Sequence, residues 1–164
     1  MCVHAANHCW LHLNWVCDVA ELVRRHPALD WPALMAEARR WGCQRILHLG
    51  LILAAELLEL ELPASVQQAL AGDTAAQRLA AQAAHRLTRY PSYWLRPFEE
   101  PLFHLRMREQ PADRLRYGLG MLTPTVKDWT YLPLPDWLAP LYYLVRPARL
   151  IIDHGLRLRA ADNQ

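Results

Sequence analysis

Hydrophobic residues recur at helical spacing along most of the chain, and the first helix-like run shows the pattern most clearly. At about 100° per residue, the run from Val3 to Arg25 places apolar side chains on both flanks of a single helix. Only a narrow polar stripe remains, and it consists of Asn7, Asn14, Asp18, Glu21 and Arg25. A helix that is apolar over most of its circumference belongs inside a domain. We therefore expect the other helices to pack around this one and to enclose the surroundings of Asp18.

Capping residues divide the next part of the chain into further helices. Asp30 stands at a helix start as an N-cap, and Gly42 stands where a helix end favours a left-handed residue. The Gly72-Asp73-Thr74 sequence is both a stop and a new cap. With these boundaries, the apolar periodicity predicts helices at residues 31–41, 44–61, 63–70 and 74–90.

Proline marks the organisation of the C-terminal half. A loop at 90–97 contains two prolines and three aromatic residues, and it predicts a hinge between two parts. We expect a core helical domain at 1–90 and a C-terminal helical appendage at 91–164, packed on the same domain. Helices are predicted at 99–109 and 112–122, and four prolines then separate helical pieces too short to fold alone.

No alternating run predicts a β-strand, so the predicted fold class is all-α. We expect a compact bundle of about seven to nine helices with a proline-rich C-terminal wrap, in a chain whose 164 residues suffice for one good core.

The charge pattern limits the classes of partner. The chain has 18 basic and 16 acidic residues, and all the basic residues except Lys127 are arginines. The planar guanidinium suits phosphate or carboxylate groups, and the C-terminal half is mildly basic. No single stretch concentrates the charge, however, so binding of nucleic acid is not favoured.

Cysteine spacing and hydropathy indicate a cytoplasmic protein. The four cysteines form no CxxC pair, which argues against a zinc knuckle or a disulfide framework. The N-terminus lacks a charged segment followed by an apolar one, and His48 interrupts the most apolar stretch, Ile46 to Ala55. Neither export nor a membrane span is predicted.

Three histidines on the predicted first helix are candidate ligands. His4, His8 and His12 recur every four residues and form one row. Two such histidines bind zinc when a third ligand comes from elsewhere. No HExxH motif accompanies them, and the simpler interpretation, which we favour, is three packed or hydrogen-bonded imidazoles. A metal site on His4, His8 and a distant ligand remains the alternative.

The polar stripe contains the candidate carboxylates. Asp18 and Glu21 suit a metal or general-base pair, although Glu21 with Arg25 is also an ordinary ion pair at i and i+4. A carboxylate on so apolar a helix needs a partner. Other reaction types have less support, because the sequence contains no GxSxG turn and no phosphate-cradling glycine loop.

Two segments resemble a known family. The run from Cys2 to Leu58, with His-x3-His and Trp-x-x-Asp-hydrophobic-Ala-x-Leu, resembles the helical C-terminal half of bacterial nucleotidyltransferase-like proteins. The segment from Thr123 to Leu150 resembles the end of the same family. Together with the polar stripe, the resemblance implies a substrate-binding set of His4, His8, Asn14, Trp15 and Asp18.

The resemblance also implies what is missing. The family is similar to the polymerase-beta-like superfamily, in which an Asp-x-Asp pair on a small mixed sheet holds Mg²⁺ and a nucleoside triphosphate (NTP). This chain has no Asp-x-Asp, so we predict no catalytic residue, no metal site and no cofactor for the chain itself. Mg²⁺ and an NTP are implied only with a catalytic palm, which is the expected partner.

Met1 falls just before the helical part, as in a truncated gene product or a chain that acts beside a separately encoded palm. The chain alone is then expected to be inactive, with an unidentified acceptor substrate. The alternative is a stand-alone, all-helical protein-interaction module without catalysis, which uses the apolar surface that a palm would cover.

Overall fold

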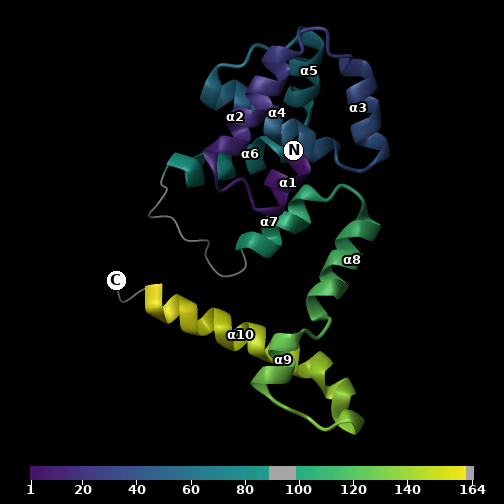
Figure 1. The fold of residues 1–164 in the computed structure, drawn as a ribbon, viewed down its shortest axis with the longest axis vertical. Coiled ribbons are helices and arrows are strands. Elements are labelled where there is room, and N and C mark those ends of the chain that lie inside the picture. The colour runs from purple at the N-terminus through teal and green to yellow at the C-terminus, as the bar shows by residue number, and fades with distance from the viewer. Residues whose placement is uncertain (89–98, 162–164) are drawn as a thin grey trace.

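The computed structural model describes residues 1–88 and 99–161, and every regular element in these ranges is a helix (Figure 1). The predicted all-α fold class is confirmed. The predicted hinge at 90–97 lies outside the described residues. The helices are α1 (Cys2–Asn7), α2 (Leu13–Arg25), α3 (Trp31–Arg40), α4 (Gln44–Leu58), α5 (Ala64–Gly72), α6 (Thr74–Thr88), α7 (Glu99–Met107), α8 (Pro111–Leu122), α9 (Val126–Tyr131), the 3₁₀ helix η1 (Asp136–Leu141) and α10 (Tyr142–Ala161).

The predicted single helix from Val3 to Arg25 is wrong, because the chain turns sharply between α1 and α2. Cys9 and Trp10 adopt left-handed conformations, with φ of 52° and 55°. The turn directs the Trp10 side chain into the core, where its exposed fraction is 0%. It packs against Gly50 so closely that a Cβ atom there would lie 2.8 Å from the Trp10 ring. Burial of the Trp10 ring explains why the helix breaks between α1 and α2, although the apolar periodicity continues through the turn.

The central helix is α4 rather than the first helix of the chain. It contacts α1, α2, α3 and α6, and its residues from His48 to Ala54 are all buried. The apolar composition of this stretch is therefore explained by burial on every side. The helices α1 and α2 cover one flank of α4, and α6 covers another.

Two aspartate caps set the start of helices as the sequence predicts. Asp30 Oδ1 accepts a hydrogen bond from the Ala33 backbone N–H at 3.0 Å, and Asp73 Oδ1 accepts one from Ala76 at the same distance. Gly42 follows α3 with φ of +64°, in the left-handed region where glycine is favoured. The predicted bounds of α3 and α6 are thus correct to within two residues.

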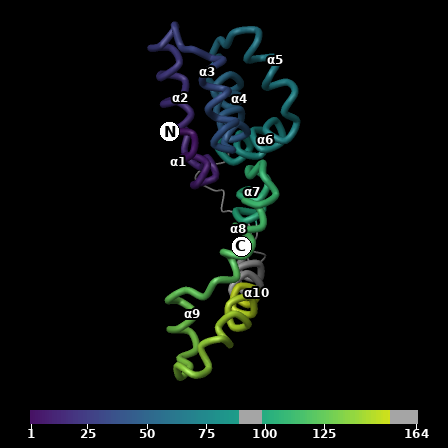
Figure 2. The backbone as a smooth tube through the Cα atoms, turned by 90° about the vertical axis from the view of Figure 1, so that its right-hand side faces the viewer, coloured from purple at the N-terminus to yellow at the C-terminus, as the bar shows by residue number. Residues whose placement is uncertain are grey.

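The C-terminal helices form their own packed unit. In both views α1 to α7 gather at one end of the molecule and α9 and α10 at the other, with α8 between them (Figures 1 and 2). The helix α10 contacts α8, α9 and η1. The Tyr142 hydroxyl ties this unit together, since it donates to the Leu132 carbonyl at 3.1 Å and accepts from the Leu134 N–H at 2.8 Å.

Asp128 is the buried polar centre of this unit. Its exposed fraction is 0%, and its carboxylate accepts hydrogen bonds from the Thr125 N–H at 2.7 Å, Arg149 Nε at 2.7 Å and Arg146 at 3.2 Å. Arg146 Nε also donates to the Met121 carbonyl at 2.8 Å. One carboxylate therefore connects α9 with α10, and Arg146 extends the connection to α8.

The four cysteines occupy different environments, and all are free thiols. Burial raises the pKa of Cys2 and of Cys9 to about 11, and it also raises the pKa of Cys43. Cys17, by contrast, is exposed on α2.

Among the described helices, none combines the length and apolar composition that crossing a membrane requires.

Candidate functional site

The turn between α1 and α2 gathers three histidines around Trp15. The His8 ring stacks on the Trp15 ring, with centroids 5.3 Å apart, and the His4 and His12 rings meet Trp15 edge-on at 5.8 Å and 4.9 Å. The three imidazoles therefore surround one indole instead of forming the predicted row along a single helix. All three histidines are exposed, and Trp15 is half-buried against the core. We call His4, His8, His12 and Trp15 the histidine–tryptophan cluster.

The histidine–tryptophan cluster presents hydrogen-bonding groups around an aromatic face, an arrangement that suits a planar or polar ligand. Among the side chains of residues 1–88 and 99–152, no group of three or more histidine, cysteine, aspartate or glutamate residues is placed to hold a metal ion.

Asn14 and Asp18 lie one turn apart on α2, and both are exposed. The expectation that other helices enclose Asp18 is wrong, because α1, α3 and α4 leave this face of α2 uncovered. Asp18 forms no hydrogen bond or ion pair with another residue of the described ranges, whereas Glu21 pairs with Arg25 at 2.6 Å. Three of the predicted site residues, His4, His8 and Trp15, are thus in mutual contact. The assignment of all five residues to substrate binding stays a prediction.

A cysteine and a histidine meet in the core, but not as a reactive pair. Cys9 Sγ lies 3.8 Å from His104 Nε2. Burial raises the pKa of Cys9 to about 11 and lowers the pKa of His104, although Glu100 near the imidazole opposes the second effect. A nucleophilic cysteine needs its thiolate form, so this neutral pair is a packing contact between the α1–α2 turn and α7.

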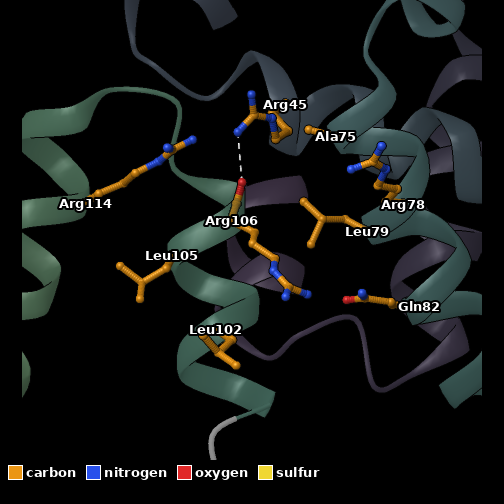
Figure 3. Close-up of a pocket in the computed structure, with 9 residues that line it drawn as sticks. All are labelled: Arg45, Ala75, Arg78, Leu79, Gln82, Leu102, Leu105, Arg106 and Arg114. Atoms are coloured by element: carbon orange, nitrogen blue, oxygen red, sulfur yellow. Dashed lines mark hydrogen bonds between the residues drawn. The ribbon is translucent and has the colours of Figure 1, made fainter.

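A second candidate site is a cavity between α4, α6, α7 and α8 (Figure 3). Its volume is about 600 Å³. We call it the arginine cavity, because four arginines and no carboxylate line it. The lining residues are Arg45, Ala75, Arg78, Leu79, Gln82, Leu102, Leu105, Arg106 and Arg114.

Arg45 is fixed in place at one end of the arginine cavity. Its guanidinium donates to the Arg106 carbonyl at 2.8 Å (Figure 3), and its backbone N–H donates to the Glu109 carboxylate. Its Nε lies 3.7 Å from Asp73 Oδ1, and the other oxygen of Asp73 contacts His48 Nδ1 at 3.0 Å. This network joins α4 to α6 and to the end of α7, and it shapes the cavity wall.

The remaining guanidinium groups are less constrained. Arg78 and Arg106 form no ion pair with any residue of the described ranges, and both side chains are exposed. In Figure 3 the Arg106 side chain extends toward Gln82 of α6, whereas the Arg78 guanidinium lies beside Ala75, on the other side of Leu79. Arg114 Nε donates to the Arg108 carbonyl at 2.8 Å. The cavity therefore carries uncompensated positive charge next to donor groups that are free to bind an anion.

Sequence reasoning missed the arginine cavity. Its four arginines lie on four different helices, so no stretch of sequence concentrates them. The local signal was the pair Arg78 and Gln82, which stand four residues apart on one face of α6. The packing of α7 against α6, and of α8 against α7, brings Arg106 and Arg114 to the same cavity.

The histidine–tryptophan cluster, Asn14 and Asp18 all fall in the first third of the chain, where a comparison with known families is informative. Residues 1–59 match the model of a family described as uncharacterised nucleotidyltransferase. The nucleotidyltransferase-like segment comprises α1 to α4, and the match supports the predicted family at this coarse level. No curated protein and no solved structure matches the chain.

The nucleotidyltransferase-like segment also contains an apolar groove of about 320 Å³. The groove runs between α2, α3 and α4, and α2 contributes Val19, Leu22 and Val23 to its lining. Trp41 at its edge is 71% exposed. Every residue that lines the groove lies within the matched segment, whereas the arginine cavity takes only Arg45 from it.

Proposed function

We propose that this chain is the helical, substrate-facing part of a nucleotidyltransferase-like protein, which transfers a nucleotidyl group from an NTP to an acceptor beside a catalytic palm. The observation that carries the proposal is the family match over residues 1–59. The sequence has no Asp-x-Asp, and two-metal transfer requires paired carboxylates. The role of this chain is then to bind and orient substrate.

The described residues do not fit the Mg²⁺ of such a reaction, because they offer no group of three ligand side chains. We therefore assign Mg²⁺ and the catalytic carboxylates to the palm, and no metal-dependent step to this chain.

We propose that the palm binds in the apolar groove. It lies wholly in the nucleotidyltransferase-like segment, and large exposed apolar surfaces commonly mark protein contacts. Because Val19, Leu22 and Val23 of α2 line it, a palm bound there would lie along α2. The exposed Asn14 and Asp18 of the same helix would then stand near the boundary between the two parts.

Restoring the palm tests the proposal. The DNA upstream of Met1 and the neighbouring reading frames are expected to encode a glycine-containing turn and an Asp-x-Asp. The two parts together are expected to transfer label from α-³²P-labelled NTPs, and this chain alone is not. A stop codon just upstream, with no such sequence nearby, would contradict the proposal and would favour the interaction module without catalysis.

Asp18→Ala is expected to lower transfer by the restored protein at least about tenfold, because a charged hydrogen-bond partner of the substrate is lost. It should leave the denaturation midpoint of this chain unchanged, since Asp18 has no polar partner among the described residues. Transfer rates and urea melts measure the two effects. Glu56→Ala, which removes an exposed carboxylate from α4, is the control, and equal losses in both variants would refute a specific role for Asp18.

A further inference from the structure

We propose that the arginine cavity binds a small molecule that carries two or more linked phosphate groups. Any link between this ligand and nucleotidyl transfer rests on the proposed function. The binding itself is a property of this chain and does not require a palm.

The charges lining the cavity specify an anion. Arginine has five N–H donors and no acceptor, so four arginines offer many donors to whatever occupies the space. Asp73 and Glu109 lie beside Arg45, but no described carboxylate pairs with Arg78 or Arg106. Both guanidinium groups are exposed, so an anion can reach them without displacing a carboxylate partner.

The number and geometry of these groups specify phosphate. A guanidinium binds two oxygens of a phosphate through parallel hydrogen bonds, and a single phosphate is small beside a cavity of about 600 Å³. Arg78 and Gln82 project from α6, and Arg106 projects from α7 (Figure 3). Donors on both walls suit a chain of linked phosphates that lies between the two helices.

The other lining residues specify a small molecule with a less polar part. Leu79, Leu102 and Leu105 line the same cavity as the arginines. Sites for small molecules usually measure about 300–1,000 Å³ and combine apolar walls with a few polar groups. The cavity is open to solvent, and its exposed arginines, Arg78, Arg106 and Arg114, are interspersed with leucines. This mixed lining distinguishes the site from a continuous basic groove for a nucleic acid strand.

Calorimetric titration of the chain with inorganic pyrophosphate, ATP, adenosine and citrate tests the inference at about 0.15 M salt, where long-range attraction between exposed charges is screened. We expect pyrophosphate and ATP to bind and adenosine and citrate to bind at least tenfold more weakly. ATP binding tighter than pyrophosphate identifies a nucleotide as the source of the phosphates, and equal affinities identify the phosphates alone. Both results support the inference.

Two variants place the binding in the cavity. Arg78→Ala and Arg106→Ala are each expected to weaken pyrophosphate binding at least about tenfold, through loss of a charged hydrogen-bonding group. Arg116→Ala is the matched control, because Arg116 is exposed on α8, pairs with Asp113 and does not line the cavity. Circular dichroism melts check that each variant folds. Arg78→Lys keeps the charge but not the planar fork, so we expect it to bind pyrophosphate with an affinity between those of the unaltered chain and Arg78→Ala.

Three results would overturn the inference: no binding of either phosphate compound to the unaltered chain, unchanged affinity in both cavity variants, or citrate that binds as tightly as pyrophosphate. None of these depends on transfer activity. If the chain binds phosphate compounds but the restored protein transfers no nucleotide, the proposed function is refuted and this inference stands. If the restored protein transfers nucleotide but the chain binds no phosphate compound, and both cavity variants keep the transfer activity, this inference is refuted and the proposed function stands.

Discussion

Replacing Asp128 with alanine is expected to destabilise the C-terminal unit by about 3–5 kcal/mol, the usual cost of removing one partner from a buried ion pair. The substitution leaves the Arg149 guanidinium buried without the carboxylate that now lies 2.7 Å from it. Hydrogen exchange of the amides in α9 and α10 measures the loss. The amides of α4 should keep their protection, because Asp128 bonds only to residues of the C-terminal helices.

Asp136→Ala is the control for this result, since Asp136 is an exposed carboxylate at the start of η1. A surface substitution of this kind usually changes stability by less than about 0.5 kcal/mol. Equal protection of α9 and α10 in the two variants would show that the Asp128 network contributes little.

The same carboxylate should make the C-terminal unit sensitive to acid. Burial alone would raise the pKa of Asp128, but hydrogen bonds from Thr125 and the Arg149 guanidinium outweigh it and hold the pKa well below its usual range. The stabilisation is therefore fully present above the unfolded-state value of 3.8 and is lost as the pH falls below it. Asp128→Asn should flatten the dependence of α10 protection on pH in this range.

Trp10→Ala is expected to lower the free energy of unfolding by about 3–5 kcal/mol, as is usual for removing a buried tryptophan. The ring is fully buried and fills the space above Gly50 in the central helix. Urea denaturation measures the loss. Trp137→Ala is the control, because the Trp137 side chain is 78% exposed, and a similar loss in both variants would contradict the central position of Trp10.

A double-mutant cycle tests the contact itself. Gly50→Ala alone should cost about 1–3 kcal/mol by overpacking, because the new Cβ would lie 2.8 Å from the Trp10 ring. In the Trp10→Ala background the ring is gone, so the cost of Gly50→Ala should fall sharply. An unchanged cost would show that Cys2 Sγ, which would lie 3.0 Å from the new Cβ atom, and not the ring, resists the methyl group.

The sequence predicted the features that depend on near neighbours along the chain. Asp30 and Asp73 each bond a backbone N–H three residues later, and such local capping is visible in any sequence. The predicted bounds of α7 and α8 also lie within two residues of the structure. The Thr125–Asp128 capping box is likewise a local feature that the sequence can predict. The burial of Asp128 is not, because it depends on Arg146 and Arg149 of the distant helix α10.

The features that sequence reasoning missed depend on distant packing. Neither glycine nor proline marks the turn at Cys9 and Trp10, and the apolar period continues through it. Left-handed conformations at such residues are costly locally, and the burial of Cys9 and Trp10 in the core offsets that cost. Asp18 is exposed because α2 packs on α4 and buries Val16, Val19 and Ala20 instead.

Cys17 is a suitable site for attaching a fluorophore, because it is exposed while the pKa of each of the other three cysteines is raised. Alkylating reagents attack the thiolate, and the raised pKa of Cys2, Cys9 and Cys43 suppresses that form at neutral pH. Mild treatment with a maleimide fluorophore is therefore expected to label Cys17, which is exposed on α2 and precedes Asp18. A dye at this position would report, through its emission or anisotropy, the arrival of a second protein along α2 in the unmutated chain.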